Sequence, residues 1–237
     1  VLDRTTYPVP TVTHKVGESS TEIGAYYLGE VLGLADYLKE EHFQKLGLRY
    51  FYDNPGNDFA QRPEFGVSSP LASRTYQMER GRLENYLWAE ALKQGVLVRE
   101  DIHVKDVLLA DDEEPHRILY HPKQNADQIQ VAGARWLVDA MGRRRFLQKK
   151  LNLTRKVGKA HSAAWFRLDG ALDVSTWVAP SNTAWHSRVC EKRWYSTNHL
   201  MGRGYWVWLI PLAPCQTSVG IVTDDACQPF ATYNTLE

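Results

Sequence analysis

The chain has 237 residues, 43% of them hydrophobic, and its 28 basic and 28 acidic side chains give a formal net charge of zero. This balance is typical of an ordinary globular protein and argues against a nucleic-acid binder or a polybasic membrane binder. No apolar run is long enough to cross a bilayer. The three cysteines (190, 215 and 227) lack CxxC spacing, so neither a disulfide framework nor a zinc site is expected. We therefore expect a cytoplasmic protein without a metal.

Hydrophobic periodicity and turn residues predict a mixture of helices and strands. A Ser-x-x-Glu capping box at Ser19 and Glu22 predicts the start of the first helix. The expected elements in chain order are helices over 20–33 and 34–44, a strand over 48–52, a long loop over 53–73, a helix over 79–93, strands over 96–98, 104–109 and 118–120, and two strand pieces within 130–140. Later segments, 165–168, 206–212 and 218–222, alternate like strands of a half-exposed antiparallel sheet.

The segment Trp206-Val207-Trp208-Leu209-Ile210-Pro211 is the strongest chemical signal. In a strand, Trp206, Trp208 and Ile210 would share one face, where two indoles form a stiff hydrophobic wall. Pro211 would limit further pairing. The residues alone fit either a bulky core strand or the wall of a site for a flat ligand.

Several polar residues lie where a nucleotide cofactor could be held. Asp3 ends an expected strand, where a carboxylate can accept hydrogen bonds from ribose hydroxyls, although a solvated loop acid would look the same. Gly17 and Glu18 precede a predicted helix whose free N–H groups could face a ligand. Arg80 lies near a helix start, where a cation is unfavourable unless a phosphate is bound; a solvated arginine is the alternative.

Lys45 lies in the segment Phe43-Gln44-Lys45-Leu46-Gly47. A lysine in the last turn of a helix complements the helix dipole, and most such lysines have no other role. An ammonium in a dry tunnel could instead hold a reactive species by a hydrogen bond or a covalent bond.

Together these segments resemble the flavin-dependent halogenases of the tryptophan halogenase-like superfamily. Residues 206–211 match the WxWxIP signature at every fixed position, and 212–222 resemble the phenol and pyrrole branch more than the tryptophan branch. Residues 14–19 resemble the K-x-G-E-S/A segment. The helix 80–87 resembles R-x-x-F-D-x-x-L, with Leu83 and Glu84 in place of Phe and Asp. Residues 138–143 resemble D-A-S/T-G-R, with Met141 replacing a small hydroxylic residue.

The resemblance implies a mixed α/β fold: an FAD-binding domain of the aromatic-hydroxylase or glutathione-reductase-like type, joined to an antiparallel substrate-side sheet. It assigns residues 1–150 to a partial FAD-binding domain, with 34–75 contributing to the substrate side, and 151–237 to a partial substrate domain. The family's K-x-G-x-x-F/Y pattern makes Lys45 the catalytic lysine, with Arg49 as the alternative register. The implied cofactor-binding residues are Asp3, Arg4, Gly17, Glu18, Ser19, Arg80, Val104, Asp139 and Gly142, and the strand separating substrate from flavin carries Trp206, Trp208, Ile210 and Pro211.

The implied activity is halogenation of an electron-rich aromatic compound, with reduced FAD from a partner reductase, oxygen, and chloride or bromide. The aromatic substrate is a small molecule, free or bound to a carrier protein. Hypohalous acid would be relayed to Lys45. The same fold also fits a flavin monooxygenase or hydroxylase, or an isoprenoid-type reductase. A further alternative is an inactive truncated remnant or a protein that binds aromatic ligands.

The chain contains no GxGxxG motif. The resemblance expects that motif before Val1, and a later Gly-Asp segment after Glu237. We therefore expect an internal fragment lacking both ends, which alone would bind FAD poorly and be inactive.

Overall fold

The computed structural model describes residues 1–111, 113–156, 158 and 160–234. They form two compact units, Val1–Val9 with Glu84–Val157, and Pro10–Leu83 with Gly158–Glu237. The expected mixed α/β class is confirmed, because helices accompany one six-stranded, one three-stranded and one two-stranded sheet. Residues 34–75 belong to the same unit as the C-terminal strands; the assignment of functional domains stays a prediction.

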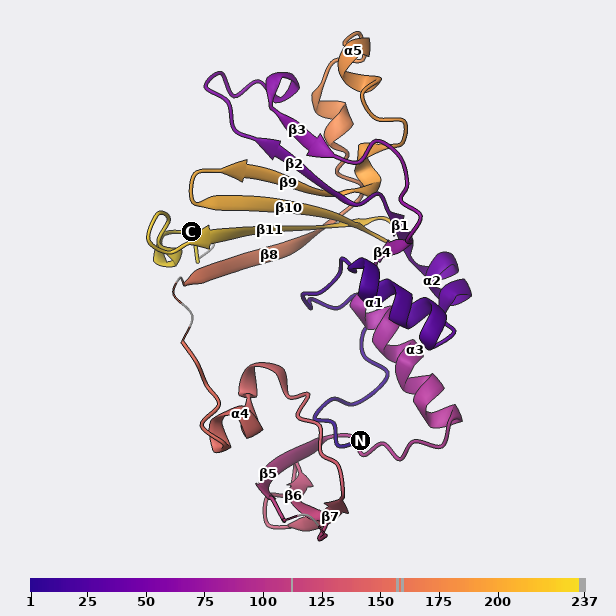
Figure 1. Ribbon diagram of the computed structural model, residues 1–237, viewed down its shortest axis with the longest axis vertical. Helices are drawn as coiled ribbons and strands as arrows, with labels where there is room; N and C mark the ends of the chain where they lie inside the picture. Colours follow the sequence, from indigo (N-terminus) through magenta and orange to yellow (C-terminus); the bar gives the residue numbers. More distant parts are fainter. Residues whose placement is uncertain (112, 157, 159, 235–237) are drawn as a thin grey trace. The chain divides into compact units, whose positions relative to one another are not determined.

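The larger unit is built on a six-stranded sheet in the order β3-β2-β9-β10-β11-β8 (Figure 1). Neighbouring strands are antiparallel except β2 and β9, which run parallel. The strands are β2 (Leu48–Tyr52), β3 (Glu64–Gly66), β8 (His161–Asp169), β9 (Thr197–Gly202), β10 (Tyr205–Leu212) and β11 (Gln216–Asp224).

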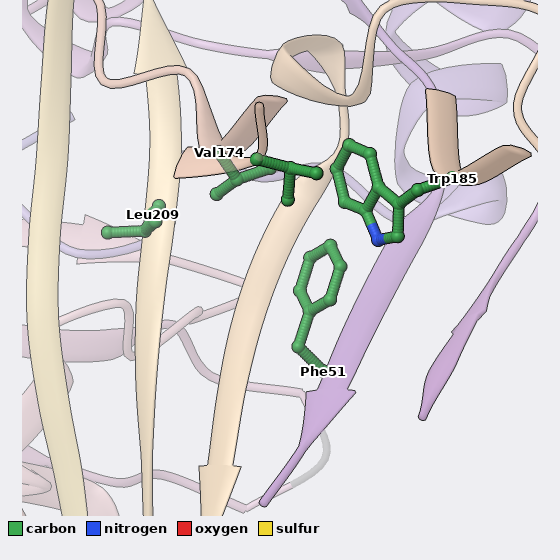
Figure 2. Packing of buried hydrophobic residues seen from close by; sticks show 5 residues of the cluster. Phe51, Val174, Trp185 and Leu209 are labelled. Carbon is green, nitrogen blue, oxygen red and sulfur yellow. The ribbon is translucent and has the colours of Figure 1, made fainter. Parts of the chain in front are cut away.

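The alternation predicted for β10 is confirmed by its packing. Leu209 joins a core cluster with Phe51, Val174 and Trp185 on one face of the sheet (Figure 2). Trp208 packs with Ile210 and Leu212 in a separate cluster on the other face. Each fully buried side chain of this size contributes roughly 1.5–3 kcal/mol to folding.

Two short helices and a two-stranded sheet complete this region. Helix α1 (Glu22–Tyr26) continues into a π-helix (Tyr27–Val31), α2 (Ala35–Glu41) follows, and β1 (Phe43–Lys45) pairs with β4 (Thr75–Gln77). The predicted Ser19 cap is wrong. Thr21 caps α1 instead, because Ser20 is hydrogen-bonded to the backbone of Tyr76 and keeps residues 19–20 extended.

Helix α3 (Arg80–Lys93) was predicted almost residue for residue. Its first turn needs Gly81, because a Cβ at that position would overlap the backbone carbonyls of Pro10 and Thr11. The expected loop over 53–73 is not free of structure, since it contains a 3-10 turn at Phe59–Gln61 and β3.

The smaller unit contains a three-stranded antiparallel sheet of β5 (Ile102–Leu108), β6 (His116–Pro122) and β7 (Gln130–Ala134), with α4 (Phe146–Lys150). The strands expected at 96–98 and 136–140 are wrong. Their apolar side chains are exposed to solvent: Leu97 is 85%, Trp136 90% and Val138 85% exposed. Because these side chains are not buried, hydrophobic burial does not stabilise a strand at either segment. The remaining helical turns are Gly142–Arg144, Val174–Trp177, Thr183–His186 (α5), Arg193–Tyr195 and Phe230–Thr232.

None of the helices in the described ranges has both the length and the apolar character needed to span a membrane. All three cysteines are free and exposed.

Candidate active site around Lys45 and the tryptophan strand

Lys45 lies on β1 and is only 8% exposed. Its Nζ donates a hydrogen bond to the backbone oxygen of Ser20 at 2.8 Å. Among the described residues no carboxylate lies within ion-pair distance of this amine. Burial lowers the pKa of Lys45, and the more distant charge of Glu22 offsets part of this effect. The interpretation of Lys45 as a helix C-terminal lysine is wrong, because α2 has already ended at Glu41.

Arg49, the alternative register, is buried in a different arrangement. Its guanidinium pairs with Glu64 at 2.5 Å and also donates to Ser196 and to the backbone oxygen of Val67. Glu64 is shared with Arg193, at 2.8 Å. Burial raises the pKa of Glu64, but the two guanidinium groups outweigh it and hold the pKa below its usual range. The guanidinium of Arg49 is therefore engaged in contacts within the protein. This arrangement favours Lys45 over Arg49 as the candidate reactive residue.

An open cavity of about 390 Å³ borders Lys45. Aromatic rings gather at its wall, where the Phe43 ring lies 5.0 Å from that of Trp194 and 6.1 Å from that of Tyr195. The cavity is lined by Lys39, His42, Phe43, Gln44, Lys45, Leu46, Pro70, Glu191 and Tyr195.

His42 is a lining residue that no sequence signal identified. It is 4% exposed, and its Nδ1 accepts the backbone N–H of Glu79 at 3.3 Å, which makes Nε2 the protonated nitrogen of the neutral ring. Burial, with the charge of Arg82, lowers the pKa of His42 to about 4. The ring packs edge-to-face with Tyr37. At neutral pH the cavity therefore has an uncharged imidazole in its wall.

Trp208 is fixed on two sides. Its Nε1–H donates to Oγ of Ser218 at 3.2 Å, and its six-membered ring occupies the space where a side chain on Gly220 would lie. Trp206 is half-buried, with its ring 6.2 Å from that of His161. Ile210 and Pro211 are buried. Trp208 is thus the more constrained of the two indoles.

A buried ion cluster lies beside this strand. Arg167 on β8 contacts Glu18 at 2.7 Å and Glu79 at 2.6 Å, and all three side chains are at most 4% exposed. Ser218 on β11 lies opposite Arg167 in the strand pairing, beside this cluster. Burial raises the pKa of Glu18, as does the charge of Glu79, whereas Ser218 and Arg167 act in the opposite direction. Sequence reasoning missed Arg167, Glu79 and Ser218, because nothing local links positions 18, 79, 167 and 218.

Two more predicted cofactor residues lie next to Glu18. Ser19 shares a hydrogen bond with Thr197 at 2.8 Å. Gly17 has φ +101°, and a Cβ there would lie 2.6 Å from Nη1 of Arg80. Arg80 donates to the backbone oxygens of Val16 and Gly17, at 2.9 and 3.4 Å. These carbonyls give Arg80 a structural reason to lie at the start of α3.

Five predicted cofactor residues belong to the smaller unit. Asp3 accepts hydrogen bonds from the backbone of Thr5 at 2.8 Å and from the hydroxyl of Tyr7 at 3.4 Å. Arg4 is exposed. The backbone oxygen of buried Val104 accepts a hydrogen bond from Arg144 at 2.6 Å.

The turn at 139–142 is held by Asp139. Its two carboxylate oxygens accept the backbone N–H groups of Met141 at 3.0 Å and Leu147 at 2.8 Å. Gly142 follows with φ +57°, and no atom lies within 4 Å of where its Cβ would be. An exposed glycine on a fixed turn fits a cofactor that is contacted through the backbone. In the part of the chain that the structure describes, no group of three or more His, Cys, Asp or Glu side chains could hold a metal ion.

Comparison with curated proteins identifies relatives. The chain is 29% identical over 220 residues to the flavin-dependent halogenase chlA of Dictyostelium discoideum, covering 84% of the chain and 35% of that protein. It is 24% identical over 190 residues to a 1H-pyrrole-2-carbonyl-[peptidyl-carrier protein] chlorinase of Pseudomonas fluorescens, covering 80% of the chain and 39% of that protein.

The chain is a relative of the flavin-dependent halogenases. The resemblance inferred from its motifs is thereby confirmed, and a pyrrole-acting enzyme among the relatives agrees with the phenol and pyrrole branch. These relatives are enzymes, and the chain spans somewhat over a third of their length. No family model matches the chain.

Solved structures share the fold. The halogenase PltM in complex with phloroglucinol and FAD matches all of the chain with a TM-score of 0.73 at 18% identity, over 48% of that protein. A flavoprotein/dehydrogenase from Cytophaga hutchinsonii matches 98% of the chain with a TM-score of 0.70 at 20% identity, over 50% of its own length. The flavoprotein fold is therefore shared, and the chemistry depends on the residues of the site.

Proposed function

We propose that the protein of which this chain forms the matched part is an FAD-dependent halogenase that chlorinates or brominates an electron-rich aromatic substrate, with Lys45 as the catalytic lysine. One observation carries this proposal. A buried amine without a carboxylate partner among the described residues borders a cavity, and its only hydrogen-bond acceptor among them is the backbone oxygen of Ser20.

The relatives and one open glycine turn support the cofactor assignment. PltM binds FAD, and the turn at Gly142 leaves space beside the backbone. Bound FAD, reduced by a partner reductase, would activate oxygen and supply oxidised halide. We propose that Asp139 and Arg80 shape the loops that contact the cofactor and that Trp208 helps to exclude the organic substrate from it.

The environment of Lys45 suits transfer of electrophilic halogen. Because burial lowers the pKa of the amine, more of it is neutral than for an exposed lysine. A neutral amine can form an N–halogen bond with hypohalous acid, releasing water, while the ammonium can hold the acid by a hydrogen bond. In either case the aromatic carbon attacks the halogen and the N–halogen or O–halogen bond breaks, its electron pair staying on the nitrogen or leaving on the oxygen; the proton then lost by the ring restores the amine or completes a water molecule.

The cavity beside Lys45 supports a small aromatic substrate. Its volume of about 390 Å³ lies near the lower end of the range for ligand pockets. Phe43 and Tyr195 can pack against a flat ring, and the hydrogen on Nε2 of His42 is a donor for a phenol or carbonyl oxygen. A phenol, a pyrrole or an indole, free or attached to a carrier protein, fits this description.

The full-length protein with FAD, a flavin reductase and bromide should convert phenolic and pyrrole-2-carbonyl compounds to brominated products. Lys45→Met should abolish bromination while flavin oxidation continues. Lys192→Met, which removes an exposed lysine outside the cavity lining, is the control and should retain activity. Hydroxylated product without any brominated product would contradict the proposal in favour of a hydroxylase.

A further inference from the structure

We propose that the segment Glu18–Ser20 is a positioning element that holds Trp208 and Lys45 in one fixed frame. Glu18 would act through Ser218 on the indole, and the backbone of Ser20 would act directly on the amine. This inference deepens the proposed function and rests on it. It also gives Glu18 a role different from the cofactor contact that its sequence motif suggests.

The link from Glu18 to Trp208 passes through one hydroxyl. Ser218 is completely buried, and its oxygen accepts the indole N–H of Trp208 at 3.2 Å. Ser218 lies opposite Arg167 in the β8–β11 pairing, and Arg167 contacts the carboxylate of Glu18 at 2.7 Å, so the hydroxyl, which has a single proton, lies beside that carboxylate. In the proposed link Glu18 accepts this proton and so orients the hydroxyl, which leaves the indole N–H one favourable direction.

The link to Lys45 begins two residues later in the same segment. The backbone oxygen of Ser20 accepts the hydrogen bond from Lys45 Nζ at 2.8 Å. Ser20 is itself tied to Tyr76 on β4, because its hydroxyl donates to the backbone oxygen of Tyr76 and accepts from the backbone nitrogen of the same residue. Strand β4 also pairs with β1, where Thr75 lies opposite Lys45. The backbone of Lys45 is therefore fixed by the strand pairing, and its amine is fixed by the hydrogen bond to Ser20.

The segment itself is anchored by the buried ion cluster. Arg167 joins Glu18 to Glu79, and the backbone of Met78 donates to the backbone oxygen of Glu18 at 2.6 Å. Removing one member of a buried ion cluster leaves uncompensated charge and is costly, so the cluster resists displacement of Glu18. Glu18 is thus fixed in position, and the segment that contains it can in turn position the side chains of Trp208 and Lys45.

The chemical consequence concerns leakage of oxidised halide. If Trp208 can tilt, the barrier between cofactor and substrate opens, while the cavity at Phe43 and Tyr195 keeps its shape. Loss of the Ser218 hydroxyl should therefore lower the yield of halogenated product per flavin oxidised, with little change in KM for the aromatic substrate.

The test uses Ser218→Ala and Glu18→Gln in the full-length holoenzyme. Thr217→Ala is the matched control, since Thr217 is a neighbouring buried hydroxyl on β11 that binds the backbone of Gly170 and Leu172 instead. We expect Ser218→Ala to lower the product formed per flavin oxidised by about tenfold, with hypohalite released to a scavenger dye, and Thr217→Ala to change this ratio little.

A second readout does not depend on catalysis. In protein labelled with 5-fluorotryptophan, the 19F resonance of Trp208, assigned by its loss in Trp208→Phe, should shift or broaden in Ser218→Ala and in Glu18→Gln but not in Thr217→Ala. An unmoved Trp208 resonance, or an equal change in Thr217→Ala, would overturn the proposal. So would a moved resonance with an unchanged product ratio. If the wild-type enzyme makes no halogenated product, the proposed function fails, and the 19F spectra still decide whether Glu18 orients Trp208.

Discussion

The indole of Trp208 lies directly over Gly220 on the neighbouring strand. The two residues are opposite one another in the β10–β11 pairing, and a Cβ added to Gly220 would overlap three carbons of the indole. The absence of a side chain at Gly220 therefore provides the space that the Trp208 indole occupies.

Gly220→Ala should displace the indole and destabilise the protein by about 1–3 kcal/mol, as expected for overpacking in a filled core. Gly133→Ala is the control, because a Cβ at that strand position meets its nearest atom at an ordinary 3.7 Å. Denaturant unfolding of the two variants measures the difference. Equal stabilities of the two variants would show that the indole can move aside freely.

Lys45→Met should leave the protein more stable than wild type by about 1 kcal/mol at neutral pH, because it removes a buried charge with no acidic partner in the described chain. The pKa of Lys45 is lowered on folding, so the wild type is penalised below that pKa and regains stability as the pH rises toward the ordinary lysine value of 10.5. The gap between the two proteins should therefore narrow between pH 7 and 10. A less stable Lys45→Met, or a gap independent of pH, would contradict this expectation.

His42 should make the protein sensitive to mild acid. Its pKa is about 4 in the folded chain against 6.5 in the unfolded chain, so the unfolded state takes up a proton first as the pH falls. Stability that is complete above pH 6.5 should decline by about 3 kcal/mol toward pH 4. His42→Asn, whose side-chain oxygen can still accept from Glu79, should flatten this decline, whereas the exposed His14→Asn should not. The same slope in all three proteins would exclude His42 as the cause.

Asp139→Ala should destabilise the smaller unit by about 2 kcal/mol even without flavin, because two backbone N–H groups lose their acceptor. Asp127→Ala, at an exposed turn, is the control. Thermal unfolding in the absence of FAD measures the effect. Unfolding like wild type together with weaker FAD binding would assign the carboxylate to the cofactor rather than to the turn.

The sequence predicted those parts of the fold that have a local period. The alternation in β10 and the apolar positions of α3 each repeat several times within one element, so they were found at nearly the correct residues. The strand that carries Lys45 has only three residues and exists because Thr75–Gln77 pairs with it. No local pattern can reveal such a strand, which is why Lys45 was placed at the end of a helix.

Candidate site residues could be proposed from the sequence where spacing carries information, and they were missed where the partners are far apart along the chain. Lys45 and Trp208 were proposed from motifs, and their functional roles stay predictions. His42 and Arg167 were not, because their contacts are with partners 37 and 149 residues away. Trp136 led to a strand prediction that is wrong. Its apolar side chain suggested a buried strand, but the side chain is 90% exposed.

The acceptor for Lys45 belongs to the main chain, so no side-chain replacement at position 20 can remove it. The position of the amine is consequently fixed by the path of the backbone, whereas its pKa is lowered by burial and raised by the charge of Glu22. An amide-to-ester replacement between Ser20 and Thr21 would weaken that carbonyl as an acceptor while keeping every side chain, which offers a chemical handle on the amine that conventional mutagenesis lacks.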